Sequence, residues 1–295
     1  MKGNGELGRL PAFLAEREGR LGPKQKRVVE FLRANPLAGA GVTIEQISEQ
    51  LEVSVSTVIR TAKELGYSGF GALKRDLRAT YLATLDPLDQ AHDRSSGAVD
   101  PDLVSAQLRR DLANMQELVD GLDVEDVEGL ARSIVSARRT MVASTGSYAS
   151  VGHVLVHLCR FLGHDVRLEV RGGSYLAHET ANLGPPDLLI VIGFWRDRAS
   201  HLRIAQHARS KGARVVALTD SRSSALAQAA SHVIDLPVES TAFYQSMVAA
   251  LAFVYAVVNA VWQLDRERSE AVARDAQSLY RDLEPFLSRS SGWPD

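Results

Sequence analysis

The stretch Val53–Leu65 reads VSVSTVIRTAKEL, which predicts a short amphipathic helix with its own cap. Ser54 is a suitable N-cap residue because its hydroxyl can accept a hydrogen bond from a backbone N–H that has no partner within the first turn. Apolar residues recur at the helical spacing that turns one face inward, and polar residues occupy the other face. The inward face consists of Val55, Val58, Ala62 and Leu65, and the outward face consists of Ser56, Thr57, Arg60 and Lys63.

Another helix is expected immediately before this one. Thr43 and Gln46 form a capping-box pattern at its start. Glu52-Val53 leaves room only for a tight turn between the two helices. Two short helices joined in this way form a helix-turn-helix, in which the second helix enters the major groove of DNA. The first helix places on its inward face Ile44, Ile47 and Leu51.

The outward face of the second helix carries side chains that suit major-groove recognition. Short hydroxyl residues allow close approach, Arg60 can donate two hydrogen bonds to a guanine edge, and Lys63 can contact a phosphate. Amides and hydroxyls in 66–70 suit contacts to the sugar-phosphate backbone. The spacing alone leaves open a helical hairpin that packs against a partner protein. The predicted DNA contacts are Ser54, Ser56, Thr57, Arg60, Lys63, Tyr67, Ser68 and Lys74.

Charge is unevenly distributed along the 295 residues. Residues 1–85 contain 13 Lys and Arg against 9 Asp and Glu, whereas residues 86–295 contain 21 against 27. A basic head on an acidic body suggests that the head meets a polyanion, although such a charge also fits an ordinary solvated surface. Together with the helix-turn-helix, it makes double-stranded DNA the predicted partner. Cys159 is the only cysteine, which excludes an intrachain disulfide and a cysteine-based zinc site.

A cytoplasmic protein without a membrane partner is expected. No apolar run approaches the ~20 residues that a membrane-spanning helix requires. The first residues lack the apolar core of a signal peptide.

The chain divides into two predicted domains. Residues 1–85 form the helical head, the Pro- and Gly-containing residues 86–102 form a linker, and residues 103–290 form the body. Strands alternating with helices predict a parallel sheet covered on both faces, so the fold is α/β overall, an all-α head joined to an α/β/α sandwich. The expected strands are 140–144, 188–193, 214–219 and 233–236, and the further helices are 103–121, 125–138, 243–264 and 266–287.

Several runs of residues resemble those of a known family. In the head they are Lys26-Arg27-Val28, Asn35-Pro36, 44–47, 53–60, 65–70 and Leu73-Lys74, and in the body 212–221, 224–226 and 230–240. The head, from Leu21 to Leu77, resembles the RpiR/MurR family of sugar-responsive transcriptional regulators. The rest, from about 103 to 285, resembles the sugar-isomerase-like (SIS) domain of these regulators. The resemblance implies a transcription factor whose body binds a phosphosugar.

The carboxyl ends of parallel strands are where a ligand is expected. Helix N-termini at this edge offer free amides to an anion. The alternative is that these segments are ordinary strand-to-helix turns, where Ser and Gly are common for backbone reasons. The predicted ligand contacts are Ser144, Thr145, Gly146, Ser147, Tyr148, Gly193, Phe194, Arg196, Thr219, Ser221 and Glu239.

The body departs from the family pattern at two of these loops. Ser144 stands where the first glycine of the usual Gly-x-Gly-x-Ser loop is expected, and Tyr148 stands at its serine. The usual Ser-x-Ser-Gly-x-Thr run is replaced by 193–198, which lacks most phosphate-binding hydroxyls. Arg196 or Arg198 can instead bind a carboxylate or a phosphate by a bidentate pair. The effector is therefore a sugar phosphate, a sugar acid or a related metabolite, and a constitutive regulator with a non-sensing body stays open.

Catalysis, cofactors and metals are not expected. A sugar-phosphate isomerase is the less favoured alternative, because isomerases of the SIS superfamily need a phosphate anchor and most of its hydroxyls are absent here, although Glu239 is a conceivable base. His153 and His157 lie one helical turn apart without an obvious third metal ligand. A homodimer or homotetramer is expected because operators are commonly two-fold symmetric, with 103–138 and 243–287 as its interface helices.

Overall fold

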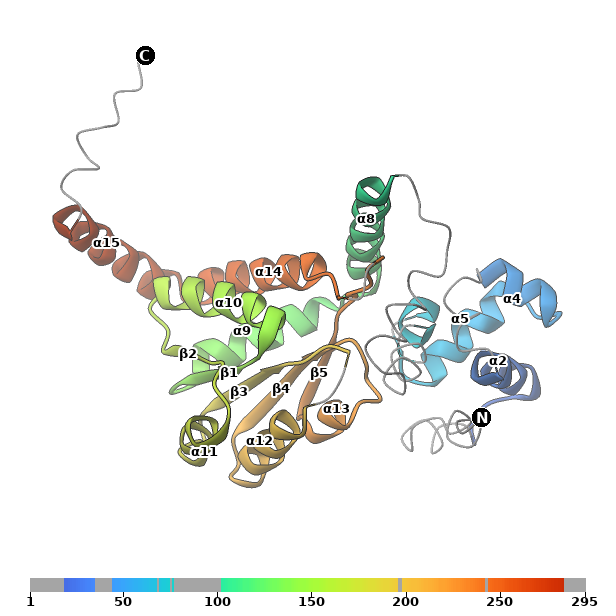
Figure 1. Ribbon diagram of the computed structural model, residues 1–295, viewed down its shortest axis with the longest axis horizontal. Coiled ribbons are helices and arrows are strands. Elements are labelled where there is room, and N and C mark those ends of the chain that lie inside the picture. Colours follow the sequence, from blue (N-terminus) through green and yellow to red (C-terminus); the bar gives the residue numbers. More distant parts are fainter. Residues whose placement is uncertain are drawn as a thin grey trace, which may run out of the picture.

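The computed structural model describes residues 19–34, 44–67, 69–74, 76, 102–195, 198–241 and 244–283, and the statements below concern these residues. A helical head and an α/β body are distinct in Figure 1, which confirms the predicted fold class.

The described part of the head contains α2 (Pro23–Ala34), α4 (Ile44–Gln50) and α5 (Val55–Glu64), and residues 70–74 and 76 are also helical. α5 packs against both α2 and α4. Their common core is apolar, because each helix turns one face toward the other two. The core includes Val28, Leu32, Ile47, Val58, Ala62 and Leu65.

The body is built on a five-stranded parallel sheet in the order β2-β1-β3-β4-β5. Thr140 in β1 pairs with Val166 on one side and with Leu188 on the other. The strand order therefore reverses at β1 and β3, which is where ligands bind in open parallel sheets. The strands are β1 (Thr140–Ala143), β2 (Val166–Glu169), β3 (Leu188–Ile192), β4 (Arg214–Thr219) and β5 (His232–Asp235).

Helices cover both faces of this sheet (Figure 1). One face is covered by α9 (Val124–Ser136), α10 (Ala149–Phe161) and α14 (Val248–Leu264), and the other by α11 (Gly173–Ala181), α12 (Ala199–Ser210) and α13 (Ala225–Ala229). α8 (Leu103–Gly121) stands at the side of the body that faces the head, and α15 (Arg266–Leu283) leaves the opposite side. A 3-10 turn, η1 (Gly146–Tyr148), precedes α10.

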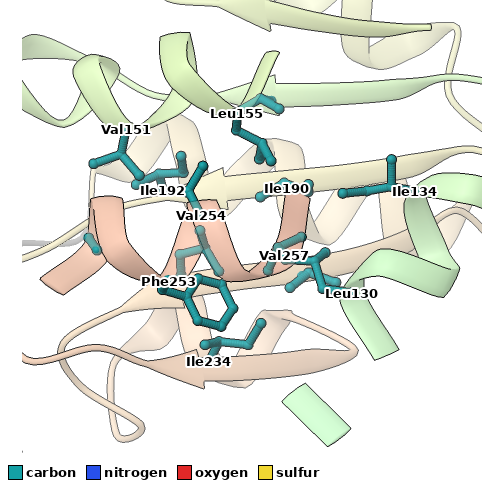
Figure 2. Close-up of a cluster of buried hydrophobic side chains, with 14 of the residues drawn as sticks. Leu130, Ile134, Val151, Leu155, Ile190, Ile192, Ile234, Phe253, Val254 and Val257 are labelled. Atoms are coloured by element: carbon teal, nitrogen blue, oxygen red, sulfur yellow. The ribbon is translucent and has the colours of Figure 1, made fainter. Parts of the chain in front are cut away.

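The main core fills the layer between the sheet and the helices α9, α10 and α14. Figure 2 shows this layer, with Ile190 and Ile192 of β3 facing Leu155 of α10 and Val254 of α14. α14 is apolar on most of its surface and six of its residues are buried, including Phe253 and Val257. Within the described chain, no single helix is long and apolar enough to cross a bilayer; only α14 and α15 together pass that test, and they meet at 103°.

Two expectations from the sequence were wrong in detail. The strand β2 was not predicted, because VRLE is an edge strand whose Arg167 is exposed and whose pattern is only partly apolar. Val55 was placed on the inward face of its helix, yet it is 37% exposed. Thr43 and most of the predicted linker lie outside the described residues; Asp102, at the linker's end, caps α8 by accepting the backbone N–H of Ser105.

Candidate DNA interface and effector site

The second helix of the helix-turn-helix begins with a hydroxyl cluster. Ser54 caps α5, since its Oγ accepts the backbone N–H of Thr57 at 3.2 Å. The same oxygen lies 2.9 Å from Ser56 Oγ and 2.8 Å from Thr57 Oγ1. These contacts fix the first turn of α5, so Ser54 has a structural role whether or not it contacts a partner.

The outward face of α5 is largely exposed. Ser56, Arg60 and Lys63 are exposed, as the spacing predicts, whereas Thr57 is partly buried. Val55 and Ile59 are each 37% exposed beside this polar stripe, and sequence reasoning did not select them as contacts. Their methyl groups are of the kind that packs on the C5-methyl of thymine. The signal was present, because Val55 and Ile59 are spaced i, i+4 along the helix.

The segment after α5 turns toward the body. Tyr67 was predicted to contact DNA, but it is 3% exposed and its hydroxyl donates a hydrogen bond to Asp76 Oδ2. In this structure the Tyr67 side chain therefore does not face solvent. Lys74 is partly buried, and the predicted contact Ser68 lies outside the described residues.

The first loop at the carboxyl edge of the sheet follows β1. Ser144 is fully buried, and its hydroxyl donates to the backbone oxygen of Ile192 at 3.5 Å. Gly146 has φ +62°, a conformation that side chains other than glycine rarely adopt. Thr145 Oγ1 is buried and has no hydrogen-bond partner among the described residues. Ser147 is exposed, and Tyr148 donates its hydroxyl to Gln245 Oε1 at 3.0 Å.

The second loop follows β3 and packs on the first. Phe194 was predicted to line the ligand site, but it is 1% exposed and its ring meets that of Tyr148 edge-on, with centroids 5.4 Å apart. Phe194 is therefore a core residue in this structure. Trp195 has φ 71°, and its backbone N–H donates to Asp220 Oδ1 at 2.8 Å. Arg196, the predicted anion contact, lies outside the described residues.

The third loop follows β4 and holds a carboxyl group. Thr219 is buried, and its Oγ1 accepts the backbone N–H of Ser221 at 3.4 Å. Burial raises the pKa of Asp220 to about 7, although the N–H of Trp195 acts in the opposite direction. Asp220 is thus a carboxyl group that changes its charge near neutral pH.

The segment after β5 completes this edge. Asn114 of α8 donates to the backbone oxygen of Glu239 at 2.7 Å, and Gln107 of α8 accepts hydrogen bonds from Ser240 and Thr241. Gln245 is 8% exposed, and its Nε2 finds no partner among the described residues. Sequence reasoning missed Gln245, because the residues around it were assigned to the apolar helix 243–264.

The structure thus brings most of the predicted ligand residues to one edge. The first and second loops meet through Tyr148 and Phe194, and the second and third through Trp195 and Asp220. Buried His201 of α12 lies behind Gly193; burial lowers the pKa of its imidazole to about 4, so it is neutral. Hydroxyls, amides and a carboxyl group that can hold a proton are suited to hydrogen-bond a polar metabolite.

Metal ligands do not gather in the described residues. No three His, Cys, Asp or Glu side chains approach one another there closely enough to hold an ion. His153 and His157 are both exposed on α10.

Both parts of the chain match known families. Residues 10–84 match the helix-turn-helix domain of the rpiR family, and residues 133–260 match the SIS domain. The HTH-type transcriptional regulator RpiR of Escherichia coli K12 is 23% identical over 238 residues, which are 80% of this chain and 78% of that protein. The uncharacterized HTH-type transcriptional regulator YfhH of E. coli K12 is 25% identical over 276 residues, covering 89% and 95%.

Solved structures agree with this assignment. The sugar isomerase domain of an RpiR transcription factor from Sphaerobacter thermophilus is 28% identical with a TM-score of 0.58, and the match covers 60% of this chain and 99% of that one. The Vibrio vulnificus NanR protein, complexed with ManNAc-6P, is 18% identical with a TM-score of 0.55, covering 92% and 98%; at that identity the match concerns the fold alone. With a helix-turn-helix of the rpiR family in front of a SIS domain, the chain belongs to the RpiR family of transcriptional regulators.

Proposed function

We propose that this regulator reads a DNA operator with α5 and binds a small anionic metabolite at the carboxyl edge of its sheet. It acts as a homodimer or homotetramer in the cytoplasm. The domain limits that go with this function are 1–85 for the head, 86–102 for the linker and 103–290 for the body. The observation that carries the proposal is the exposed polar face of α5 on a head that contacts the same edge of the body.

Operator reading is assigned to the outward face of α5. Arg60 and Lys63 are exposed one turn from the hydroxyls of Ser56 and Thr57. A guanidinium at this position can bind a guanine edge in the major groove, and an ammonium can bind a phosphate. Base contacts determine sequence preference, whereas phosphate contacts mainly set affinity.

The test uses an operator selected by the full-length chain from random duplex DNA. Arg60→Ala is expected to weaken binding by about 1–3 kcal/mol and to relax the preference at one base position. Arg203→Ala removes another exposed arginine, on α12, and is the control. Equal operator affinity of Arg60→Ala and the wild type would show that α5 does not read DNA through this residue.

The effector is assigned to the three strand-end loops and the segment after β5. The relative from V. vulnificus is complexed with a sugar phosphate. In this chain the loops offer Thr145 Oγ1 and Gln245 Nε2, two buried polar atoms without a partner among the described residues. A ligand with hydroxyl and anionic groups would satisfy such atoms, which are costly to leave unpaired.

Thermal unfolding against paired sugars, sugar phosphates and sugar acids identifies the effector class. A ligand at ~100 times its Kd stabilises the folded state by about 2.7 kcal/mol. For a domain of this size, each kcal/mol raises the midpoint by about 2–4 °C. Gln245→Leu, which removes the amide, is expected to abolish the shift, whereas Gln206→Leu at an exposed position of α12 retains it. If no compound shifts the midpoint, the body is a non-sensing domain.

We infer that the body is not an isomerase. RpiR and YfhH of E. coli K12, which align with 80% and 89% of this chain, are HTH-type transcriptional regulators. Glu239 is the residue that a catalytic proposal would need as its base. Turnover of a sugar phosphate that is lost in Glu239→Gln would contradict this inference.

Two apolar surfaces support self-association. α8 exposes Val104, Leu108, Leu112 and Val119 along one side. A groove of about 650 Å³ runs between the ends of α10 and α14 and the exposed helix α15, lined by Phe161, Trp262 and Tyr280. Exposed apolar patches of this kind are typical of interfaces. A second copy of the chain is the occupant we assign to the groove, because two-fold symmetric operators require paired heads.

A further inference from the structure

The head touches the body through one buried carboxylate. Asp76, which follows α5 in the head, is 2% exposed. Its Oδ1 accepts hydrogen bonds from the hydroxyl of Ser221 and from the hydroxyl and backbone N–H of Ser223, the last two at 2.9 and 3.3 Å. Its Oδ2 accepts the hydroxyl of Tyr67, which also belongs to the head. Several donors converging on one carboxylate are the arrangement that binds an anion.

These donors lie at the proposed effector site. The turn 221–223 directly follows β4, and Asp220 at its start binds the second loop through Trp195. A serine hydroxyl has a single O–H to donate. Ser221 and Ser223 therefore cannot donate their hydroxyl protons to Asp76 and to an external anion at the same time.

We propose that the turn Ser221–Ser223 is an anion-binding site for which Asp76 of the head competes with the anionic group of the effector. Effector binding then releases the head from the body. This inference rests on the proposed function, because it takes the phosphate or carboxylate of the effector proposed there as the competing group. Release changes how the heads of an oligomer are held, and hence the spacing of their α5 helices.

The energetics of the contact suit a switch. Burial raises the pKa of Asp76, while the hydrogen bonds from Ser221, Tyr67 and Ser223 act to lower it. The cost of burying a carboxylate offsets much of what its hydrogen bonds contribute, so such a contact is close to balance. A ligand that makes further contacts at the loops can then displace it.

A neighbouring contact connects the docked head to the same edge of the body. A Cβ added to Gly71 of the head would collide with the carboxylate of Glu117 in α8. α8 in turn holds the segment after β5 through Asn114 and Gln107. Docking can therefore be disturbed at Gly71 without changing Asp76 or the two serines.

The test measures the distance between head and body while an anion is added. Cys159 is buried, and burial raises the pKa of its thiol to about 12, so it resists labelling. Glu49→Cys on α4 and Arg203→Cys on α12 provide two exposed labelling positions in the full-length chain. Both cysteines are spin-labelled, and the labelled protein is diluted into unlabelled protein so that distances within one chain dominate. The distance between the two labels is then measured by double electron–electron resonance during titration with inorganic phosphate or acetate. Potassium chloride at matched ionic strength is the control.

Competition predicts that variants whose heads are all released differ in anion affinity, which rises when Asp76 is replaced and is lost when the two serines are replaced. Asp76→Asn is expected to be released without any anion and to bind the probe anion on the order of 10- to 100-fold more tightly than the wild type. Gly71→Asp, which places a carboxylate against Glu117, should behave in the same way. Ser221→Ala with Ser223→Ala is expected to be released but to lose anion binding. Asp275→Asn on exposed α15 should match the wild type.

Several outcomes would overturn the inference. The first is that Asp76→Asn and Gly71→Asp both bind the anion with wild-type affinity. The second is that the head of the wild type stays docked at saturating anion. The third is that neither phosphate nor acetate binds any variant. A metabolite that shifts operator affinity equally in wild type and Asp76→Asn would leave sensing intact and refute competition. Conversely, tight anion binding and release in Asp76→Asn, with no metabolite bound by the wild type, would support competition and refute the proposed effector class.

Discussion

Asp220, on the loop after β4, keeps its proton at a pH where most carboxyl groups are ionised. Its pKa is raised to about 7, against ~3.9 in an unfolded chain. Between those two values the folded state keeps a proton that the unfolded state releases, so the free energy of unfolding falls as pH rises from about 4 to about 7. Asp220→Asn keeps an oxygen for the N–H of Trp195 but carries no charge. We expect the variant to exceed the wild type in stability by on the order of 1–4 kcal/mol at pH 8 and to match it near pH 4.

Urea unfolding at several pH values measures this difference. Asp275→Asn, on the exposed face of α15, is the control and should follow the wild-type pH profile. An Asp220→Asn profile that ran parallel to the wild type would mean that Asp220 is not the group that titrates.

At the same scale, the outward face of α5 could be predicted because helical spacing fixes which side chains share a face. Tyr67 and Phe194 could not. Tyr67 lies beyond the helix end, where its direction depends on Asp76 and on the docked body. Phe194 could stack on a ligand or fill a core, and only its tertiary contact with Tyr148 decides between them.

Among the elements, α10 lies unusually close to the sheet at one glycine. A Cβ added to Gly152 would come within 2.8 Å of Leu168 Cδ1 in β2 and 3.3 Å of Val142 Cγ1 in β1. Gly152→Ala is therefore expected to lower the free energy of unfolding by about 1–3 kcal/mol, because a well-packed layer must shift. Since α10 follows the first loop directly, the same shift should weaken effector binding.

Gly129 in α9 is the matched position. A Cβ there would meet Glu125 Oε1 at 3.6 Å and Arg132 Nη2 at 3.9 Å, both ordinary van der Waals contacts with the ends of flexible side chains. Gly129→Ala should raise stability by about 0.5–1 kcal/mol, because alanine favours the helix. Urea unfolding of both variants tests the pair, and stabilisation by Gly152→Ala would show that α10 does not pack as the structure has it.

Elements with a strong apolar period were predictable from the sequence, as the match of β4 to 214–219 and of α8 to 103–121 illustrates. β2 was not, because an edge strand shares only one side with a neighbour and carries exposed Arg167. The contact between Asp76 and the turn after β4 joins residues about 145 positions apart, a pairing that no local period encodes.

For the whole molecule, the position of α15 makes a specific prediction about assembly. The helix leaves the body (Figure 1), and Ser269 is its only buried residue. The apolar side chains of Tyr280 and Leu283 are 57% and 70% exposed. If a second copy occupies the groove, Tyr280→Glu places a charge in a desolvated interface and should dissociate it. Sedimentation should then show a smaller assembly than the wild type, down to the 32.1 kDa chain if this is the sole interface. Operator affinity should fall with it, because one head makes half the contacts.

The control is Ser278→Glu, which adds the same charge to α15 at a residue that does not line the groove. Leu112→Glu tests the apolar side of α8 separately. A tetramer that becomes a dimer in both Tyr280→Glu and Leu112→Glu needs two interfaces, one on each surface. A dimer that is lost only in Tyr280→Glu assigns pairing to the groove and not to the apolar side of α8. An unchanged mass in Tyr280→Glu would rule out the groove as the interface, and the pairing of the heads would then have to come from α8.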